Sequence, residues 1–191
     1  DADPSVFEPL REPVAARAAE FRQAMIDAEP LQLDVLVDFA AQAYRINRAG
    51  KLPLMVDADH GYGNALNVMR TVQELETAGV AALMIEDTLL PRAFGEKKPT
   101  TISLEEGIGK MTAALAARED KALTIIGRTS APSINGLADG IKRLKAYQDT
   151  GVDALFIAGG LTRSDLDAIA GELKTRGLAG LRHIGAHGHR D

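Results

Sequence analysis

The chain contains no cysteine and no tryptophan, and aromatic residues make up only 4% of its 191 positions. Without cysteine the protein cannot form disulfides, thiolate metal sites or a cysteine nucleophile. The absence of cysteine also fits a cytoplasmic protein. Sparse aromatic residues combined with plentiful alanine and glycine are common in tightly packed α/β proteins, which gives a first indication of the fold class.

Basic residues are in short supply as well. The 22 lysines and arginines stand against 27 aspartates and glutamates, so the net charge is −5 and no basic excess is available to neutralise a nucleic-acid backbone. The longest apolar runs, such as residues 52–56, are far shorter than the ~20 residues of a membrane span. Residues 1–4 lack the basic and apolar regions of a secretory signal. These absences predict a soluble cytoplasmic protein that binds neither nucleic acid nor membranes.

Short apolar segments of β type alternate with longer amphipathic segments along most of the chain. Strands are expected at residues 52–57, 80–85, 123–126 and 153–158. Helices are expected at residues 35–48, 65–78, 137–150 and 164–176, with one more after the plausible N-cap Ser103. This alternation predicts right-handed βαβ crossovers and a parallel sheet. Two similar stretches, G-V-A-A-L-M-I-E-D and G-V-D-A-L-F-I-A-G, favour the internal repetition of a (β/α) barrel, with an open doubly wound sheet as the alternative.

The chain is short for a complete barrel, which usually needs ~250 residues. Only doubtful strands are visible at residues 24–26 and 181–184. We therefore expect a single (β/α)8 TIM-type barrel domain over residues 1–191 that is incomplete, shortened near residues 24–33 and after about residue 185.

Ionisable side chains follow three consecutive predicted strands. Asp57 and Asp59 end the first, Glu86 follows the second, and Arg128 follows the third. Because ligands bind at the carboxyl ends of the strands in parallel α/β folds, these side chains are expected to surround one spot. Residues two apart on a strand point to the same side, which predicts that the two aspartates project together.

These groups have a chemistry in common. Clustered carboxylates repel one another unless a cation intervenes. An oxygen-only set suits a hard ion, Mg²⁺ or Mn²⁺, and Mg²⁺ keeps several waters, so that one direct carboxylate with others holding those waters is physically natural. The planar fork of Arg128 suits a substrate carboxylate or phosphonate. The combination predicts a small anionic substrate bound by the metal on one side and by Arg128 on the other.

The segments around these residues carry further predictions. Gly61-Tyr62-Gly63-Asn64 is expected to form a tight turn with Asn64 as a helix N-cap, and His60 is expected to be structural rather than a base. The polar stretch 91–101 is long for a strand–helix connection and suggests a functional loop or lid.

Three motifs, D-A-D-H-G-Y-G-N at 57–64, I-E-D at 85–87 and G-R-T at 127–129, resemble the isocitrate lyase/phosphoenolpyruvate mutase superfamily over roughly residues 35–170. The resemblance implies an (α/β)8 barrel, Mg²⁺ enolate-type chemistry on α-keto acids, and a homo-oligomer, dimer or tetramer. By position, Asp59 matches the direct metal ligand, whereas Asp57 and Glu86 match carboxylates that hold metal-bound water. Arg128 matches the arginine that grips the substrate carboxylate. His189, in a Gly-His pair, is similar to a histidine that lines the active site.

The loop after Glu86 separates the subgroups of this superfamily. Its carbon–carbon lyases carry K-[KR]-C-G-H there, with the cysteine as general acid, whereas this chain reads L-P-R-A-F-G-E-K-K-P-T-T and has no cysteine. The stretches D-A-D-H-G-Y-G-N-A-L-N-V and I-E-D-T-L-L-P-x-x-F-G are more similar to those of the superfamily's oxaloacetate decarboxylases. That similarity implies Mg²⁺-dependent decarboxylation of oxaloacetate, or of a close α-keto acid, to pyruvate and CO₂ through a metal-stabilised enolate.

Two alternatives remain open. Within the superfamily, the chain can be a phosphonopyruvate hydrolase, a carboxyphosphonoenolpyruvate mutase-type enzyme or a (methyl)isocitrate lyase-like member. If the chain is not an enzyme, the alternative is a non-catalytic barrel remnant that binds only metal. The remnant hypothesis rests on a missing feature: family members carry a Gly/Ser-rich substrate loop after the first strand, whereas residues 24–33 read A-M-I-D-A-E-P-L-Q-L without glycine or serine.

Overall fold

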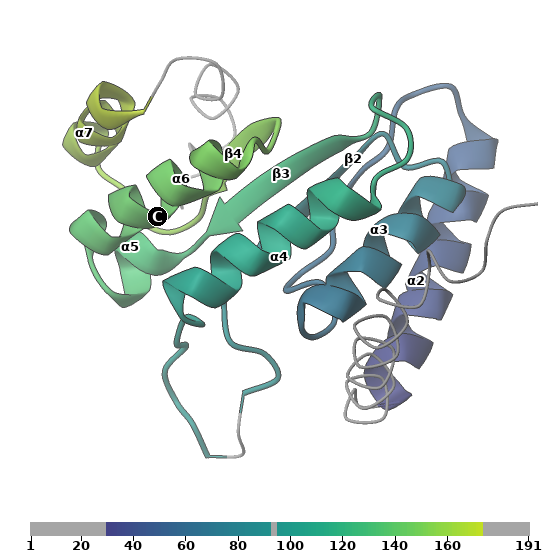
Figure 1. Ribbon diagram of the computed structural model, residues 1–191, viewed down its shortest axis with the longest axis horizontal. Helices are drawn as coiled ribbons and strands as arrows, with labels where there is room; N and C mark the ends of the chain where they lie inside the picture. The colour runs from purple at the N-terminus through teal and green to yellow at the C-terminus, as the bar shows by residue number, and fades with distance from the viewer. Residues whose placement is uncertain (1–29, 93–94, 174–191) are drawn as a thin grey trace, which may run out of the picture.

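The computed structural model describes residues 30–92 and 95–173, which form an alternating series of helices and strands (Figure 1). The helices are α2 (Pro30–Ala49), α3 (Ala65–Thr77), α4 (Leu104–Ala117), α5 (Ala131–Ile134), α6 (Leu137–Thr150) and α7 (Arg163–Glu172). The strands are β1 (Met55–Asp57), β2 (Ala82–Glu86), β3 (Thr124–Thr129) and β4 (Ala154–Ile157).

The four strands form one parallel sheet in the order β1-β2-β3-β4. Because each crossover advances by one strand in the same direction and such crossovers are right-handed, the connecting helices must all lie on one face of the sheet. Figure 1 shows α3, α4 and α6 side by side across that face. A doubly wound sheet would reverse its strand order and carry helices on both faces. The arrangement confirms the predicted barrel-type fold class and rejects the doubly wound alternative.

The hydrophobic core lies between the sheet and these helices. Leu83 and Ile85 of β2 and Ile125 of β3 are fully buried, and they belong to the same core as Met111 of α4 and Leu144 of α6. Burying each aliphatic side chain of this kind contributes about 1.5–3 kcal/mol. The alternate residues of the strands face away from the helices, and this alternation decides which polar side chains reach the site.

Helix ends follow the predicted signals. The Asn64 side chain accepts hydrogen bonds from the first turn of α3 in a capping box, and Ser103 accepts one from the backbone of Glu106 at the start of α4. Helix α6 has the predicted bounds and is followed by Gly151 in the left-handed conformation at φ 93°. Local sequence signals therefore set these boundaries.

Other boundaries differ from the predictions. Strand β1 is only three residues long: it begins at Met55 rather than at residue 52, and it ends at Asp57 as predicted. Helix α2 begins earlier than expected, at Pro30, and the short helix α5 was not predicted. The doubtful strands at 24–26 and 181–184 and the region after residue 185 lie outside the described residues, as does the first part of the segment 24–33. None of the helices in the described part of the chain is long and apolar enough to cross a membrane.

Candidate active site

The carboxyl ends of β1, β2 and β3 bring three of the predicted site residues together. Glu86 and Arg128 are direct partners in the β2–β3 register. The Arg128 guanidinium forms an ion pair with the Asp57 carboxylate, and its Nε lies 3.3 Å from Glu86 Oε2. The predicted convergence of strand ends on one spot is therefore present in the fold.

Asp59 joins this group through a turn, which corrects the prediction that it shares a strand face with Asp57. Asp59 has a left-handed backbone at φ 47°. Its N–H donates to Asp57 Oδ1 at 3.0 Å, and its carbonyl accepts from the N–H of Glu86 at 2.7 Å. The strand alternation fails here because β1 ends at Asp57, and the turn instead ties Asp59 to both neighbouring carboxylate residues.

The turn that follows is packed closely against α3. Gly61 has φ 75°, and a Cβ at this position would overlap the Val68 side chain. Thr71 Oγ1 donates to the Gly61 carbonyl at 3.1 Å. Glycine is therefore required at residue 61 for conformation and for space. The tight turn predicted from the sequence is confirmed, and it fixes the end of the Asp59 segment.

Electrostatics at the site disfavour an uncompensated set of carboxylates. Burial, followed by the charge of Asp57, raises the pKa of Asp59. Burial also raises the pKa of Glu86, although Arg128 opposes that shift. Both carboxylates would ionise more readily beside an additional cation.

The donor set fits a hard divalent cation, with a restriction on how it would bind. Carboxylate oxygens are the ligands that Mg²⁺ prefers. Within residues 30–92 and 95–173, however, no three His, Asp or Glu side chains converge as a preformed metal cluster. Because Mg²⁺ retains waters, the set fits a metal held directly by Asp59, with Asp57 and Glu86 acting through water. This ligand assignment stays a prediction.

Arg128 is also held by an aromatic ring. Its Cζ lies 5.9 Å from the centroid of the Phe156 ring, at a distance that permits a cation–π interaction. Arg128 Nε is buried and makes no hydrogen bond, although Glu86 Oε2 is within ion-pairing distance. Since a guanidinium has five N–H donors, Arg128 keeps donors for an anionic ligand while it remains oriented by Asp57 and Phe156.

His60 is buried beside the carboxylates, and neither of its ring nitrogens has a partner. Burial and the nearby charge of Lys110 lower the pKa of His60 to about 4, so the imidazole is neutral near pH 7. Lys110, also buried, donates from Nζ to the His60 carbonyl at 3.1 Å, and burial lowers its pKa as well. Lys110 is not among the residues predicted from the sequence, because its contact with His60 joins positions 50 residues apart.

Directly behind Glu86, a second polar cluster was also missed. The carboxylate of Asp87 is completely buried and accepts hydrogen bonds from the hydroxyls of Thr129 at 2.9 Å and Tyr147 at 2.7 Å. Arg143 adds an ion pair to Asp87 at 3.1 Å. A signal was available: Arg143 lies on the apolar stripe of α6 with Leu144 and Tyr147, a position where a charged residue needs a buried partner.

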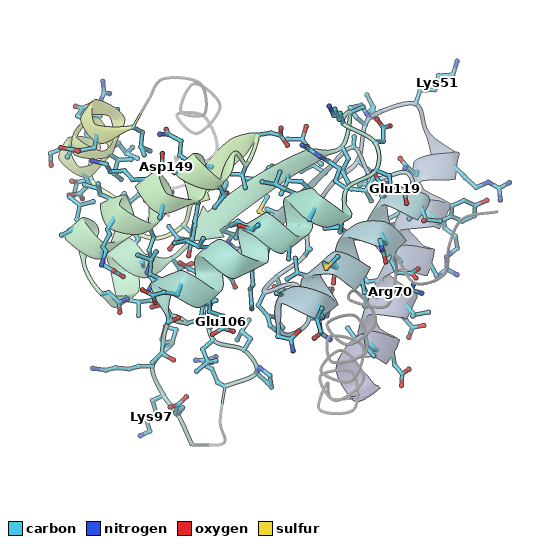
Figure 2. All side chains as sticks on the ribbon, viewed as in Figure 1. Lys51, Arg70, Lys97, Glu106, Glu119 and Asp149 are labelled. Carbon is cyan, nitrogen blue, oxygen red and sulfur yellow. The ribbon has the colours of Figure 1, made fainter. Side chains whose placement is uncertain are left out.

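The segment between β2 and α4 leaves the sheet at the end where these residues gather (Figure 1). Thr88 and Thr101 form an antiparallel bridge at its base, and the Leu89 N–H donates to the Thr100 carbonyl at 2.8 Å. Lys97 and Lys98 are exposed, and Figure 2 shows Lys97 directed away from the body of the molecule. The role of this loop as a lid stays a prediction.

His189 lies outside the described residues, so its predicted place in the active site stays a prediction.

Comparison with known proteins decides the family. A family model described as phosphoenolpyruvate phosphomutase matches residues 15–182. The chain belongs to this family. The resemblance drawn from the three sequence motifs is thereby confirmed.

Relatives of this family member include enzymes of several activities. It is 58% identical over 147 residues to an oxaloacetate decarboxylase of Bradyrhizobium diazoefficiens, a match that covers 77% of this chain and 51% of that protein. A solved oxaloacetate acetylhydrolase, in complex with 3,3-difluorooxalacetate, is 29% identical with a TM-score of 0.66, over 74% of this chain and 49% of that one. A phosphonopyruvate hydrolase solved with oxalate and Mg²⁺ is 31% identical with a TM-score of 0.62, over 69% and 46% of the respective chains.

The chain spans about half the length of the curated relatives it matches. The predicted similarity to the oxaloacetate decarboxylases of the superfamily is confirmed at the level of sequence.

Proposed function

We propose that this chain carries the catalytic strand ends of a Mg²⁺-dependent carboxy-lyase that converts oxaloacetate, or a close α-keto acid, to pyruvate and CO₂. The observation that carries the proposal is the convergence of Asp57, Glu86 and Arg128 at the ends of three consecutive strands. The 58% identity to an oxaloacetate decarboxylase supports the choice of substrate. A homo-oligomer, which the family resemblance implies, and a cytoplasmic location, which the composition suggests, remain expectations.

Arg128 is the substrate-binding residue of this proposal. Its guanidinium is held in place by Asp57 and by the ring of Phe156, so little conformational freedom is lost when it binds a carboxylate. A planar pair of N–H donors can bind one carboxylate of an α-keto acid through two parallel hydrogen bonds. Arg128 would thereby fix the orientation of the bond that breaks when CO₂ leaves.

The carboxylates define the other side of the substrate site. Asp59 would hold the metal directly, and Asp57 and Glu86 would orient its waters. When bound, Mg²⁺ supplies positive charge to the oxygen on which negative charge develops during decarboxylation. Loss of CO₂ leaves the enolate of pyruvate, which needs a proton and no protein nucleophile. The absence of cysteine is compatible with such a reaction.

The direct test is CO₂ release from oxaloacetate in the presence of Mg²⁺ by the full chain and by its Asp59→Ala variant. Loss of a direct metal ligand is expected to lower turnover by more than about 100-fold. Asp149→Ala is the matched control, because Asp149 is an exposed aspartate of α6 (Figure 2). Undiminished turnover in Asp59→Ala would eliminate the proposed ligand.

A phosphonopyruvate hydrolase is the second candidate, because a solved relative with that activity is 31% identical and holds oxalate and Mg²⁺. The same donors that suit a carboxylate suit a phosphonate. Incubation with phosphonopyruvate and detection of free phosphate by ³¹P NMR separates the two activities. Phosphate release that is faster than CO₂ release from oxaloacetate would favour this candidate.

The non-catalytic remnant is tested by binding rather than turnover. Calorimetric titration with Mg²⁺ and oxalate, a mimic of the enolate, measures whether the strand ends bind the ligand pair. Binding without turnover of either substrate supports the remnant, and binding with turnover excludes it. Absence of binding contradicts both the enzyme and the remnant.

A further inference from the structure

The buried cluster behind Glu86 joins three segments that are distant in the sequence. Asp87 follows the last residue of β2, Thr129 is the last residue of β3, and Arg143 and Tyr147 lie one turn apart on α6. Burial and the charge of Asp87 raise the pKa of the Tyr147 phenol, which therefore stays protonated as a hydrogen-bond donor. The Asp87 carboxylate consequently ties the ends of two strands to one helix.

Arg143 connects this cluster to the segment that follows β2. Its NH1 donates to Asp87 at 3.1 Å and its Nε to Asp139 at 2.8 Å, whereas its NH2 donates to the carbonyl of Ile102 at 2.9 Å. The side chain of Arg143 is only 7% exposed, and all three of its nitrogens are engaged. Arg143 is thus fully engaged by protein groups, and it contacts both ends of the connection between β2 and α4.

The base of that connection is closed by further bonds. The Ile102 N–H donates to the Asp87 carbonyl at 2.9 Å, which joins the two ends of the connection directly. Asn135 Nδ2 donates to Thr101 Oγ1 at 2.9 Å and to Asp139 at 2.7 Å. Arg143, Asp139 and Asn135 therefore hold the returning end from the side of α5 and α6.

Two residues of this cluster are direct sequence neighbours of two residues of the candidate site. Asp87 is the neighbour of Glu86, and Thr129 is the neighbour of Arg128. Successive residues at a strand end point to opposite sides. Fixing Asp87 and Thr129 on the helix side therefore fixes the directions in which Glu86 and Arg128 leave the backbone.

We propose that Arg143 is a positioning residue, which fastens the two ends of segment 88–102 to Asp87 and thereby orients Glu86 and Arg128. The role in orientation rests on the proposed function, whereas the fastening of the segment does not. A lysine at this position retains the charge beside Asp87. Its single ammonium group cannot reproduce the planar three-way contact of the guanidinium.

The test compares Arg143→Lys with the unchanged full chain by limited trypsin digestion under native conditions. Lys97 is exposed within the fastened segment, so the rate of cleavage after Lys97, followed by mass spectrometry, reports opening of the segment (Figure 2). Loss of charge-assisted hydrogen bonds is expected to accelerate this cleavage about tenfold or more, while cleavage after Arg70 in α3 is unchanged. Lys142→Gln, an exposed neighbour on α6, serves as the control and is expected to leave both rates unchanged.

Two outcomes of the digestion overturn the fastening. One is an unchanged rate after Lys97, and the other is an equal acceleration at Lys97 and Arg70, which would indicate global destabilisation. Both readouts are independent of catalysis. Failure of the proposed function is therefore distinguishable, because it leaves the digestion result intact.

Orientation is tested by the kinetics of CO₂ release from oxaloacetate in Arg143→Lys. If Arg143 orients Glu86 and Arg128, KM rises and kcat falls, with kcat/KM reduced about tenfold or more. A merely structural residue would reduce the active fraction and leave KM unchanged. A fall in kcat at constant KM therefore contradicts the positioning role.

Discussion

The carboxyl ends of β2 and β3 each carry two adjacent polar residues that face opposite sides of the sheet. Glu86 and Arg128 join Asp57 on the open side, where the Asp57 side chain is 46% exposed. Asp87 and Thr129 face the helices, where the Asp87 side chain is completely buried and saturated with hydrogen bonds. The adjacent carboxylates Glu86 and Asp87 are both buried, but they face opposite sides of the sheet and have different partners.

The two sides also differ in how completely their polar atoms are paired. Within the described parts of the chain, the buried side-chain nitrogens without a hydrogen-bond partner are Nδ1 and Nε2 of His60 and Nε of Arg128. Of these, the Arg128 nitrogen belongs to the open side, where it lies 3.3 Å from Glu86 Oε2. Unpaired buried groups are costly, so an unpaired guanidinium nitrogen beside the carboxylates is typical of a site that binds a ligand rather than of a purely structural cluster. The helix-side cluster is therefore expected to provide stability, and under the proposed function the open side provides the chemistry.

The largest expected effect on stability comes from removal of the buried carboxylate. Asp87→Ala leaves Arg143 as a buried cation with a lost partner, and we expect the free energy of unfolding to fall by about 3–5 kcal/mol. Urea denaturation followed by circular dichroism measures the change. A loss below about 1 kcal/mol, as for an exposed ion pair, would contradict the assignment of stability to the helix side.

Tyr147→Phe tests a single bond of the same cluster. The phenylalanine ring fills the same space but cannot donate to Asp87, so a loss of about 1.5–3 kcal/mol in the free energy of unfolding is expected. Tyr44→Phe, at a half-exposed position of α2, is the matched control and should be close to neutral. Equal denaturation midpoints for the two variants would show that the buried hydroxyl contributes nothing.

Gly107→Ala tests the space that the cluster needs. A Cβ at Gly107 would overlap the Tyr147 hydroxyl, and we expect a destabilisation of about 1–3 kcal/mol. Gly109, two residues along in α4, has no atom within 4 Å of its Cβ position. Gly109→Ala should therefore stabilise the protein by about 0.5–1 kcal/mol through helix propensity. Thermal unfolding of both variants checks whether the two substitutions differ in sign.

Asp57→Asn tests the open side, where a small effect on stability and a larger effect on activity are expected. Because Asp57 is 46% exposed, loss of its ion pair with Arg128 should change the free energy of unfolding by less than about 1 kcal/mol. Under the proposed function, the same variant should lower CO₂ release by about 10–100-fold, because an orienting carboxylate is lost. A large loss of stability with unchanged turnover would reverse the roles of the two sides.

Local sequence signals were sufficient for most of the fold. The bounds of α6 follow from the apolar spacing of residues 137–150 and from Gly151, and the parallel sheet follows from the alternation of strands and helices. Asn64 and Ser103 cap their helices as expected, because a cap depends only on a few neighbouring backbone groups. The length of β1 was overestimated, since its apolar pattern continues upstream of Met55 without strand pairing.

The site was predictable in part, for a different physical reason. Strand ends in a parallel sheet meet at one edge, so the approach of Asp57, Glu86 and Arg128 followed from topology alone. The left-handed turn that places Asp59 depends on hydrogen bonds to β2, and these are not encoded locally. Arg143 was missed because its partner Asp87 is 56 residues away in the sequence.

The most direct test of a catalytic role for the open side compares CO₂ release from oxaloacetate by the full chain and by Arg128→Gln. Both proteins are measured at the same Mg²⁺ concentration, and the rate with Mg²⁺ alone is subtracted. We expect turnover above that background in the unchanged chain and its near-complete loss in Arg128→Gln, with similar urea midpoints for both proteins. Equal rates in the two proteins, or a rate no higher than the background in the unchanged chain, would contradict this role.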